Sequence, residues 1–170
     1  MTTGPTDPLA GDSTSTPPGS PSPTADTDDS VVETLDAALA GEHAAVYAYG
    51  VIGAYLTGDD RDRAAAELSR HRAARDRLAA HIRAAGGTPS ASLPTYALPY
   101  PVADAASAAD LADLVEERLG GLYSDVVTST SGATRSESAD ALVHTARARA
   151  AWSGTATAFP GLDERLTLEP

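Results

Sequence analysis

The residues of this sequence that could do chemistry are a few acids and histidines set inside otherwise apolar, helix-like stretches. Glu42 stands out in ALAGEHAAVYAYG, residues 38–50, because a carboxylate there can be a metal ligand or half of an ion pair. With about 100° of rotation per residue, Glu42 falls near the centre of the apolar stripe, between Leu39 and Val46. His43 falls at the edge of that stripe. We therefore expect Glu42 to be buried and His43 to be a bystander.

Two polar residues of the next helix-like stretch, His71 and Arg75, also fall near the centre of its apolar stripe. If the turn between the two helices is centred near residue 58 or 59, antiparallel pairing sets Arg75 opposite Glu42. His71 then lies one turn further along, about 6 Å in axial rise. A carboxylate buried alone is very costly, and an arginine can bind one with two parallel hydrogen bonds. The spacing predicts a buried polar cluster of Glu42, His71 and Arg75 that fixes the register of the hairpin.

A metal site is the alternative interpretation of the same residues. A di-iron helical bundle takes a glutamate from each of two helices and a Glu-x-x-His motif from each of the other two. Here Glu67 lies four residues before His71, rather than three, and the fourth helix-like stretch has no Glu-x-x-His. In projection, Glu116 and His144 point away from the apolar stripes of their helices, and Arg75 would repel a cation. We therefore expect no resident cofactor, and keep as the alternative an iron or manganese site formed by Glu42, Glu67, His71, Glu116 and His144.

Tyrosine is the main aromatic residue, with six copies beside one Phe and one Trp. A face that binds a ligand or a partner is one hypothesis, and it would use Tyr47, Tyr49, Tyr123 and Trp152. Tyrosines at the edge of a core, with the hydroxyl in water, are the simpler interpretation. Trp152 projects away from the main stripe of its helix, and we expect it under the C-terminal FPGL segment or in a dimer contact.

The elements that position these residues are four helix-like stretches, at about residues 30–57, 60–85, 105–129 and 136–158. Between the second and the third lies GGTPSASLPTYALPYPVAD, which has four prolines and no helical period. Fully extended, it could cover about 60 Å, whereas a helix of some twenty-six residues is about 39 Å long. Its tyrosines, Tyr96 and Tyr100, are expected to hold it against the helices. The sequence therefore predicts an all-α fold, a ferritin-like four-helix bundle of two antiparallel hairpins joined by a long Pro-rich crossover, over residues 31–162.

Composition limits the classes of function and the surroundings. The 170 residues carry a net charge of -12 and no cysteine. The acidic balance argues against a nucleic-acid partner, and disulfides and thiolate metal sites are excluded. No run of eighteen apolar residues and no secretory signal is found, so no membrane association and a cytoplasmic location are expected. Residues 1–30 hold six of the twelve prolines and are expected to form a disordered tail, with a second tail at 163–170.

Several motifs in order resemble a bacterial family. They are LAGEHAAVYAYGVIGA, HRAARDRLAAHIRAAGGTP, YALPYPV, LADLVEERLGGLY, ARARAAW and FPGL. The sequence is similar here to ferritin-like domain-containing proteins of high-GC bacteria, a family of unknown function. The resemblance implies a cytoplasmic ferritin-like bundle with no established activity, within a superfamily that binds di-iron or di-manganese centres. It implies that Glu42 matches the first-helix ligand and that His71 matches the histidine of the second-helix motif, while the remaining ligands have no good match.

Two functions follow as hypotheses from these observations. The first is a metal-free bundle that acts as a binding or structural module, with a homodimer, another protein or a small molecule as its partner. The alternative is a metal-binding oxidoreductase with a reduced ligand set. The expected arginine next to Glu42 favours the metal-free module over the oxidoreductase, because a positive charge in the pocket disfavours a metal ion.

Overall fold

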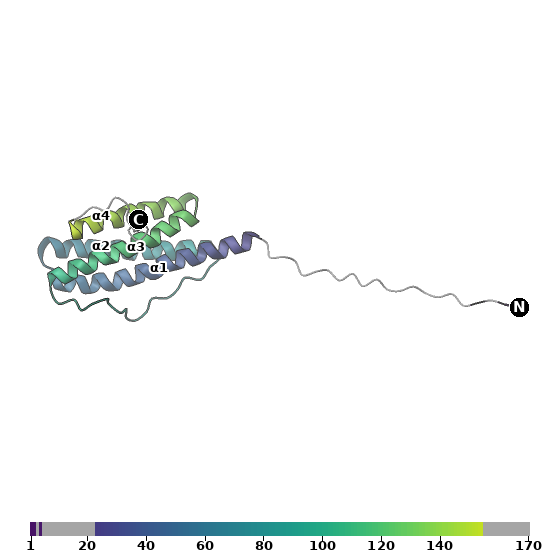
Figure 1. Cartoon of the computed structure of the whole chain (residues 1–170), viewed down its shortest axis with the longest axis horizontal. Coiled ribbons are helices and arrows are strands. Elements are labelled where there is room, and N and C mark those ends of the chain that lie inside the picture. Colours follow the sequence, from purple (N-terminus) through teal and green to yellow (C-terminus); the bar gives the residue numbers. More distant parts are fainter. Residues whose placement is uncertain (3, 5–22, 155–170) are drawn as a thin grey trace, which may run out of the picture.

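The computed structural model describes residues 1–2, 4 and 23–154, and these form four helices (Figure 1). They are α1 (Pro23–Tyr55), α2 (Gly58–Ala84), α3 (Ala105–Ser129) and α4 (Gly132–Ser153). The predicted all-α four-helix bundle is confirmed. The C-terminal tail at 163–170, the FPGL segment and most of the N-terminal tail at 1–30 lie outside the described residues.

The helix bounds follow from local chemistry. α1 begins at Pro23, seven residues before the expected start at Ser30, and proline suits a first helical position because no amide hydrogen is needed there. The start of α3 at Ala105 is as expected, since Asp104 and Ser107 form a reciprocal capping box. α4 ends before Gly154, which has a φ of 69°, a left-handed conformation that favours glycine.

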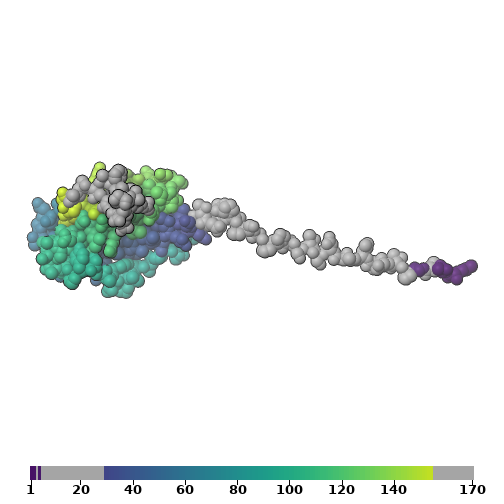
Figure 2. Space-filling model, viewed as in Figure 1, coloured from purple at the N-terminus to yellow at the C-terminus, as the bar shows by residue number. Residues whose placement is uncertain are grey.

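The two hairpins and the crossover define the topology. Leu56 and Thr57 alone separate α1 from α2, and Thr130 and Ser131 alone separate α3 from α4, so each pair is antiparallel. The crossover, residues 85–104, runs along the outside of the bundle on the side of α1 (Figure 1) and forms part of the lower flank in the space-filling view (Figure 2). This long connection brings α2 and α3 into parallel directions (Figure 1).

Polar and aromatic contacts hold the crossover against α1. The backbone N–H of Ser90 donates to Asp36 Oδ1 at 2.9 Å, and the Ser90 hydroxyl donates to Asp36 Oδ2. His43 Nε2 lies 3.2 Å from the carbonyl oxygen of Ser90. The Tyr47 and Tyr96 rings lie 5.7 Å apart, centroid to centroid. Tyr96 therefore has the role expected for it, and His43 belongs to the outside of the bundle.

The core consists of two apolar clusters with a polar layer between them. The first comprises Leu35, Ala38, Leu39, Ala45, Leu78, Ile82, Leu119, Tyr123 and Val126. The second comprises Ala48, Tyr49, Ile52, Leu56, Ala64, Val102, Ala108, Leu111 and Ala112. Glu67, His71 and Glu116 come from helix positions between these clusters, and the buried Glu42 contacts His71 from within the first. Any charge in that layer is consequently surrounded by apolar side chains along the bundle axis.

The four helices do not pack equally. The close pairs are α1 with α2, α1 with α3, and α3 with α4. α2 and α4 instead face each other across a cleft, which leaves one side of the polar layer accessible. Within the part of the chain that the structure describes, no helix has both the length and the apolar character needed to cross a membrane.

Candidate functional site

His71 lies between two buried carboxylates at the centre of the bundle. Its Nδ1 is 2.9 Å from Glu42 Oε2, and its Nε2 is 3.2 Å from Glu116 Oε1. Glu42 and Glu116 are each 1% exposed, and His71 is 3% exposed. Burial alone would lower the pKa of His71, but the hydrogen bonds to Glu116 and Glu42 raise it to about 10. The imidazole is therefore a cation at neutral pH in the metal-free protein.

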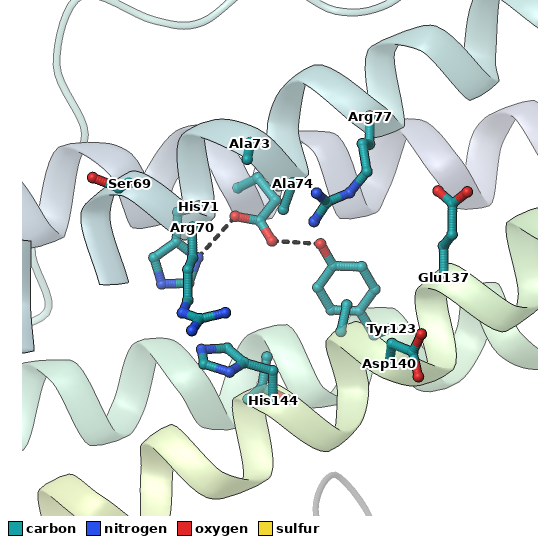
Figure 3. A pocket seen from close by; sticks show the side chains of 13 residues that line it. Ser69, Arg70, His71, Ala73, Ala74, Arg77, Tyr123, Glu137, Asp140 and His144 are labelled. Carbon is teal, nitrogen blue, oxygen red and sulfur yellow. Dashed lines mark hydrogen bonds and ion pairs between the residues drawn. The ribbon is translucent and has the colours of Figure 1, made fainter. Parts of the chain in front are cut away.

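Two tyrosine hydroxyls donate hydrogen bonds to these carboxylates, one to Glu42 and one to Glu116. Tyr123 donates to Glu42 Oε1 at 2.5 Å, and Figure 3 shows this bond together with the one from His71. Tyr49 donates to Glu116 Oε1 at 2.6 Å and accepts a hydrogen bond from Trp152 Nε1 at 3.0 Å. Burial and the neighbouring carboxylates raise the pKa of both tyrosines far above the ordinary value. Both are therefore neutral donors.

A second acid–histidine pair links α2 to α4 beside this network. His144 Nε2 lies 2.6 Å from Glu67 Oε2. Burial raises the pKa of Glu67, but the hydrogen bond and charge of His144, together with the charges of His71 and Arg70, outweigh it and lower the pKa overall. Glu67 is buried and His144 is partly exposed. This pair spans the same side of the bundle on which α2 and α4 stand apart.

One oxygen of this layer has no protein partner. Glu116 Oε2 is buried and accepts no hydrogen bond from any residue that the structure describes. Ligand atoms of Glu67, His71 and Glu116 all lie within 4.8 Å of one another. Because Glu42 and Glu116 share one imidazolium, this part of the layer has one negative charge more than it has positive charges. A buried unpaired oxygen with excess negative charge favours a cation.

The predicted pair of Glu42 with Arg75 does not form. The Arg75 side chain is 32% exposed, and its guanidinium binds the adjacent Asp76 at 2.8 Å. The turn between α1 and α2 is centred near residue 56 or 57, two residues earlier than expected. This moves the antiparallel partner of Glu42 by four residues, from Arg75 to His71. The argument that Arg75 excludes a metal ion from the pocket is therefore wrong.

The expected outward orientations of Glu116 and His144 are also wrong. Glu116 is in line with the core residues Ala112, Leu119 and Tyr123 of α3, all at helical spacing. Projected from Leu122 of the apolar stripe, Glu116 points away from the core, but Leu122 is only partly buried and packs on the flank toward α1. The buried positions of α4 are Ser138, Thr145 and Ala148, and His144 lies beside this face, where it reaches Glu67.

The aromatic residues do not form the single face for a ligand or partner that the sequence suggests. Tyr49 and Tyr123 are 1% and 3% exposed and donate to carboxylates inside the bundle. Tyr47 packs on the crossover, away from them. Trp152 contacts Tyr49, and the guanidinium of Arg63 lies 5.1 Å from its ring centroid. The expected cover of Trp152 by FPGL lies outside the described residues.

Two features of the sequence could have indicated this arrangement. An acid stands four residues before a histidine on both α2 and α4, as Glu67 with His71 and as Asp140 with His144. This equal spacing suggests that α2 and α4 each direct a histidine toward the same polar layer. Arg70 and Arg77 lie seven residues apart on α2, on the face of Ala74, and both line the cleft toward α4. Two arginines seven residues apart with a small residue between them indicate a helix face that is accessible and positively charged.

The topology and the buried acid–histidine layer together define a ferritin-like four-helix bundle. A family model described as a domain of unknown function (DUF4439) matches residues 34–164, and the chain belongs to this family. A conserved hypothetical protein from Mycobacterium tuberculosis is similar, with 31% identity, a TM-score of 0.70, and coverage of 76% of this chain and 96% of that chain. No curated protein sequence matches the chain.

A second solved structure is similar in fold. It belongs to ferritin-like, diiron-carboxylate proteins from Bacillus anthracis str. Ames, with 20% identity and a TM-score of 0.52. The match covers 75% of this chain and 91% of that chain. At this identity the likeness shows the fold alone, so the ligands of any metal must be judged from the residues present.

Those residues do not complete a two-metal centre. Such a centre takes four carboxylates and two histidines, whereas the layer has three glutamates and two histidines. The position three before His144 is Ala141, which has no ligand atom. Glu42 is also occupied by His71 and Tyr123. A single ion fits if its binding displaces the proton from Nε2 of His71, because Glu67, His71 and Glu116 converge and Glu116 Oε2 has a free lone pair.

Proposed function

We propose that this protein binds one divalent transition-metal ion, iron or manganese, in the centre of the bundle through Glu67, His71 and Glu116. The observation that carries the proposal is the buried, unpartnered Oε2 of Glu116 within a group of ligand atoms that lie within 4.8 Å. Carboxylate oxygens and an imidazole nitrogen suit Fe(II) and Mn(II), and the chain offers no thiolate. Bound there, the ion supplies redox chemistry, which is the oxidoreductase hypothesis.

Glu42 has a supporting role in this proposal. Its Oε2 accepts from His71 Nδ1, and this contact leaves Nε2 as the nitrogen that faces Glu116. A carboxylate that accepts from the far nitrogen of a ligating histidine orients the ring and makes it a better donor. Tyr123 in turn holds Glu42 through its other oxygen. Glu42 therefore acts through His71, unlike a first-helix glutamate that binds the metal directly.

The chain also controls access to the ion. The apolar clusters on both sides of the polar layer exclude water along the bundle axis. Tyr49 donates to Glu116 Oε1 and so orients that carboxylate with its other oxygen free. His144 holds Glu67 from the α4 side. The open side between α2 and α4 is then the route by which small molecules reach the layer.

A metal-free binding or structural module is the competing function, and one observation favours it. The chain of hydrogen bonds from Tyr123 through Glu42, His71 and Glu116 to Tyr49 is continuous, with the His71 cation between the two acids. That imidazolium can serve as the counter-charge in place of a metal ion. Under this alternative the layer fixes the packing of α1, α2 and α3, and the protein has no redox chemistry.

Titration of the chelator-treated protein with Mn(II) tests the proposal. We expect one tightly bound ion per chain, measured as the loss of the free Mn(II) signal in electron paramagnetic resonance. Glu42→Gln should weaken binding by about 10- to 100-fold, the usual effect of losing a partner that orients a ligating histidine. Glu33→Gln, at an exposed position of the same helix, is the matched control and should bind as the wild type does. Absence of stoichiometric binding would leave the metal-free module as the function.

A further inference from the structure

The cleft between α2 and α4 has the size of a small-molecule site. Its volume is about 550 Å³, within the range of roughly 300–1,000 Å³ for ligand pockets. It is roomy because small side chains face it from both helices; these are Ser69, Ala73, Ala74, Ala141 and Thr145. Its lining also includes Glu42, His71 and Tyr123, so it opens onto the buried polar layer.

Two arginines give one wall of the cleft its charge. Arg70 and Arg77 lie seven residues apart on α2, two turns along the same face, or roughly 10 Å. Arg70 and Arg77 both line the cleft, and Figure 3 shows the guanidinium of Arg77 directed toward Tyr123. Neither arginine has a hydrogen bond or an ion pair with another residue in the described part of the chain. By contrast, Arg75 on the same helix binds Asp76.

The acids of the facing wall lie at one end of the cleft. Figure 3 places Glu137 and Asp140 on the Tyr123 side, away from Arg70 and His144. Glu137 Oε2 is already 2.9 Å from His81 Nε2. At the other end, His144 is already paired with Glu67 at 2.6 Å, so Arg70 and Arg77 are the groups of the cleft left to bind an anion. In a chain with a net charge of -12, two arginines that face one cleft without an ion pair are a specific place for an anion.

We propose that this cleft binds a small organic anion whose carboxylate or phosphate group is held by Arg70, with Arg77 as the second anchor. A guanidinium presents paired N–H donors that match both kinds of group. Asp140 can accept from a hydroxyl at the other end of the molecule. The binding itself does not require a metal ion; that this anion is the substrate of the metal centre rests on the function proposed above.

The test uses the metal-free protein labelled with ¹⁵N. The Nε–Hε signals of Arg70 and Arg77, assigned from the variants Arg70→Gln and Arg77→Gln, are followed while the probe is added. The probes are malate, glycerol 3-phosphate and inorganic phosphate, with malamide as the neutral counterpart of malate. We expect saturable shifts with at least one anion and none with malamide. The better anion identifies a carboxylate or a phosphate group as the recognised chemistry.

Variants separate this site from general charge attraction. Arg70→Gln should weaken binding by about tenfold or more, as expected for the loss of a charge-assisted hydrogen bond. Arg72→Gln, at an exposed position of the same helix outside the cleft, should leave affinity unchanged. Equal weakening by both variants, or no saturable binding of any probe, would overturn the proposal. Glu116→Gln should keep anion binding and lose metal binding, so the two proposals fail independently.

Discussion

Replacing His71 with alanine destabilises the metal-free protein by about 3–5 kcal/mol, the effect expected when one partner of a buried charge pair is removed. Glu42 and Glu116 then remain buried within the same layer without the cation that both contact. Their remaining donors, Tyr123 and Tyr49, are neutral and cannot balance the charge. The free energy of unfolding, measured by urea denaturation in the presence of a chelator, gives the effect directly.

A second histidine on α2 provides the control. His81 is also paired with an acid, Glu137 at 2.9 Å, but both side chains are partly exposed to water. Removing such a surface pair costs about 1 kcal/mol or less. We therefore expect His81→Ala to retain nearly all of the stability. If His71→Ala were as stable as His81→Ala, the buried network would not contribute to the stability of the fold.

Glu116→Gln separates metal binding from stability. The amide keeps an oxygen for Tyr49 and His71, but it removes the charge and the unpartnered oxygen. We expect the affinity for Mn(II) to fall by more than about 100-fold, beyond the loss typical of a supporting partner. The stability of the metal-free protein should change by only about 1 kcal/mol, because the buried negative charge is also removed.

Glu117→Gln is the neighbouring control for this experiment. Glu117 is more than one-third exposed and binds Arg149 at 2.8 Å on the surface. The Glu117→Gln variant should bind Mn(II) with the affinity of the wild type. An unchanged affinity in Glu116→Gln would mean that Glu116 is not a ligand, and parallel losses of affinity and stability in that variant would indicate a purely structural role.

The fold could be predicted from the sequence because its signals are local and repeated. Apolar residues at helical spacing indicate four helices, and the Pro-rich segment 86–104 is long enough to require a crossover. The start of α3 at Ala105 agrees with the expected position, and Asp104 and Ser107 form a capping box there. The start of α1 at Pro23 was not predictable, because the residues before Ser30 are polar and carry no apolar period.

The site could be predicted only in part, because it depends on register and on small rotations. Glu42 and His71 fall on strong apolar stripes, and their burial follows from periodicity. Arg75 was placed wrongly by a turn centre only two residues too late. Glu116 was placed wrongly by a reference direction at Leu122, which packs on the flank of α3. The contact of His144 with Glu67 depends on how α4 packs against the rest of the bundle, which no single helix encodes.

The most direct test of the central claim is X-ray diffraction from crystals grown with Mn(II), with anomalous differences recorded to locate the ion. The account predicts a single anomalous peak per chain among Glu67, His71 and Glu116, with Glu42 still bound to the far nitrogen of His71. Two peaks, or one peak coordinated by Glu42, would contradict the single-ion site. A fully loaded crystal with no peak in the bundle would contradict metal binding altogether.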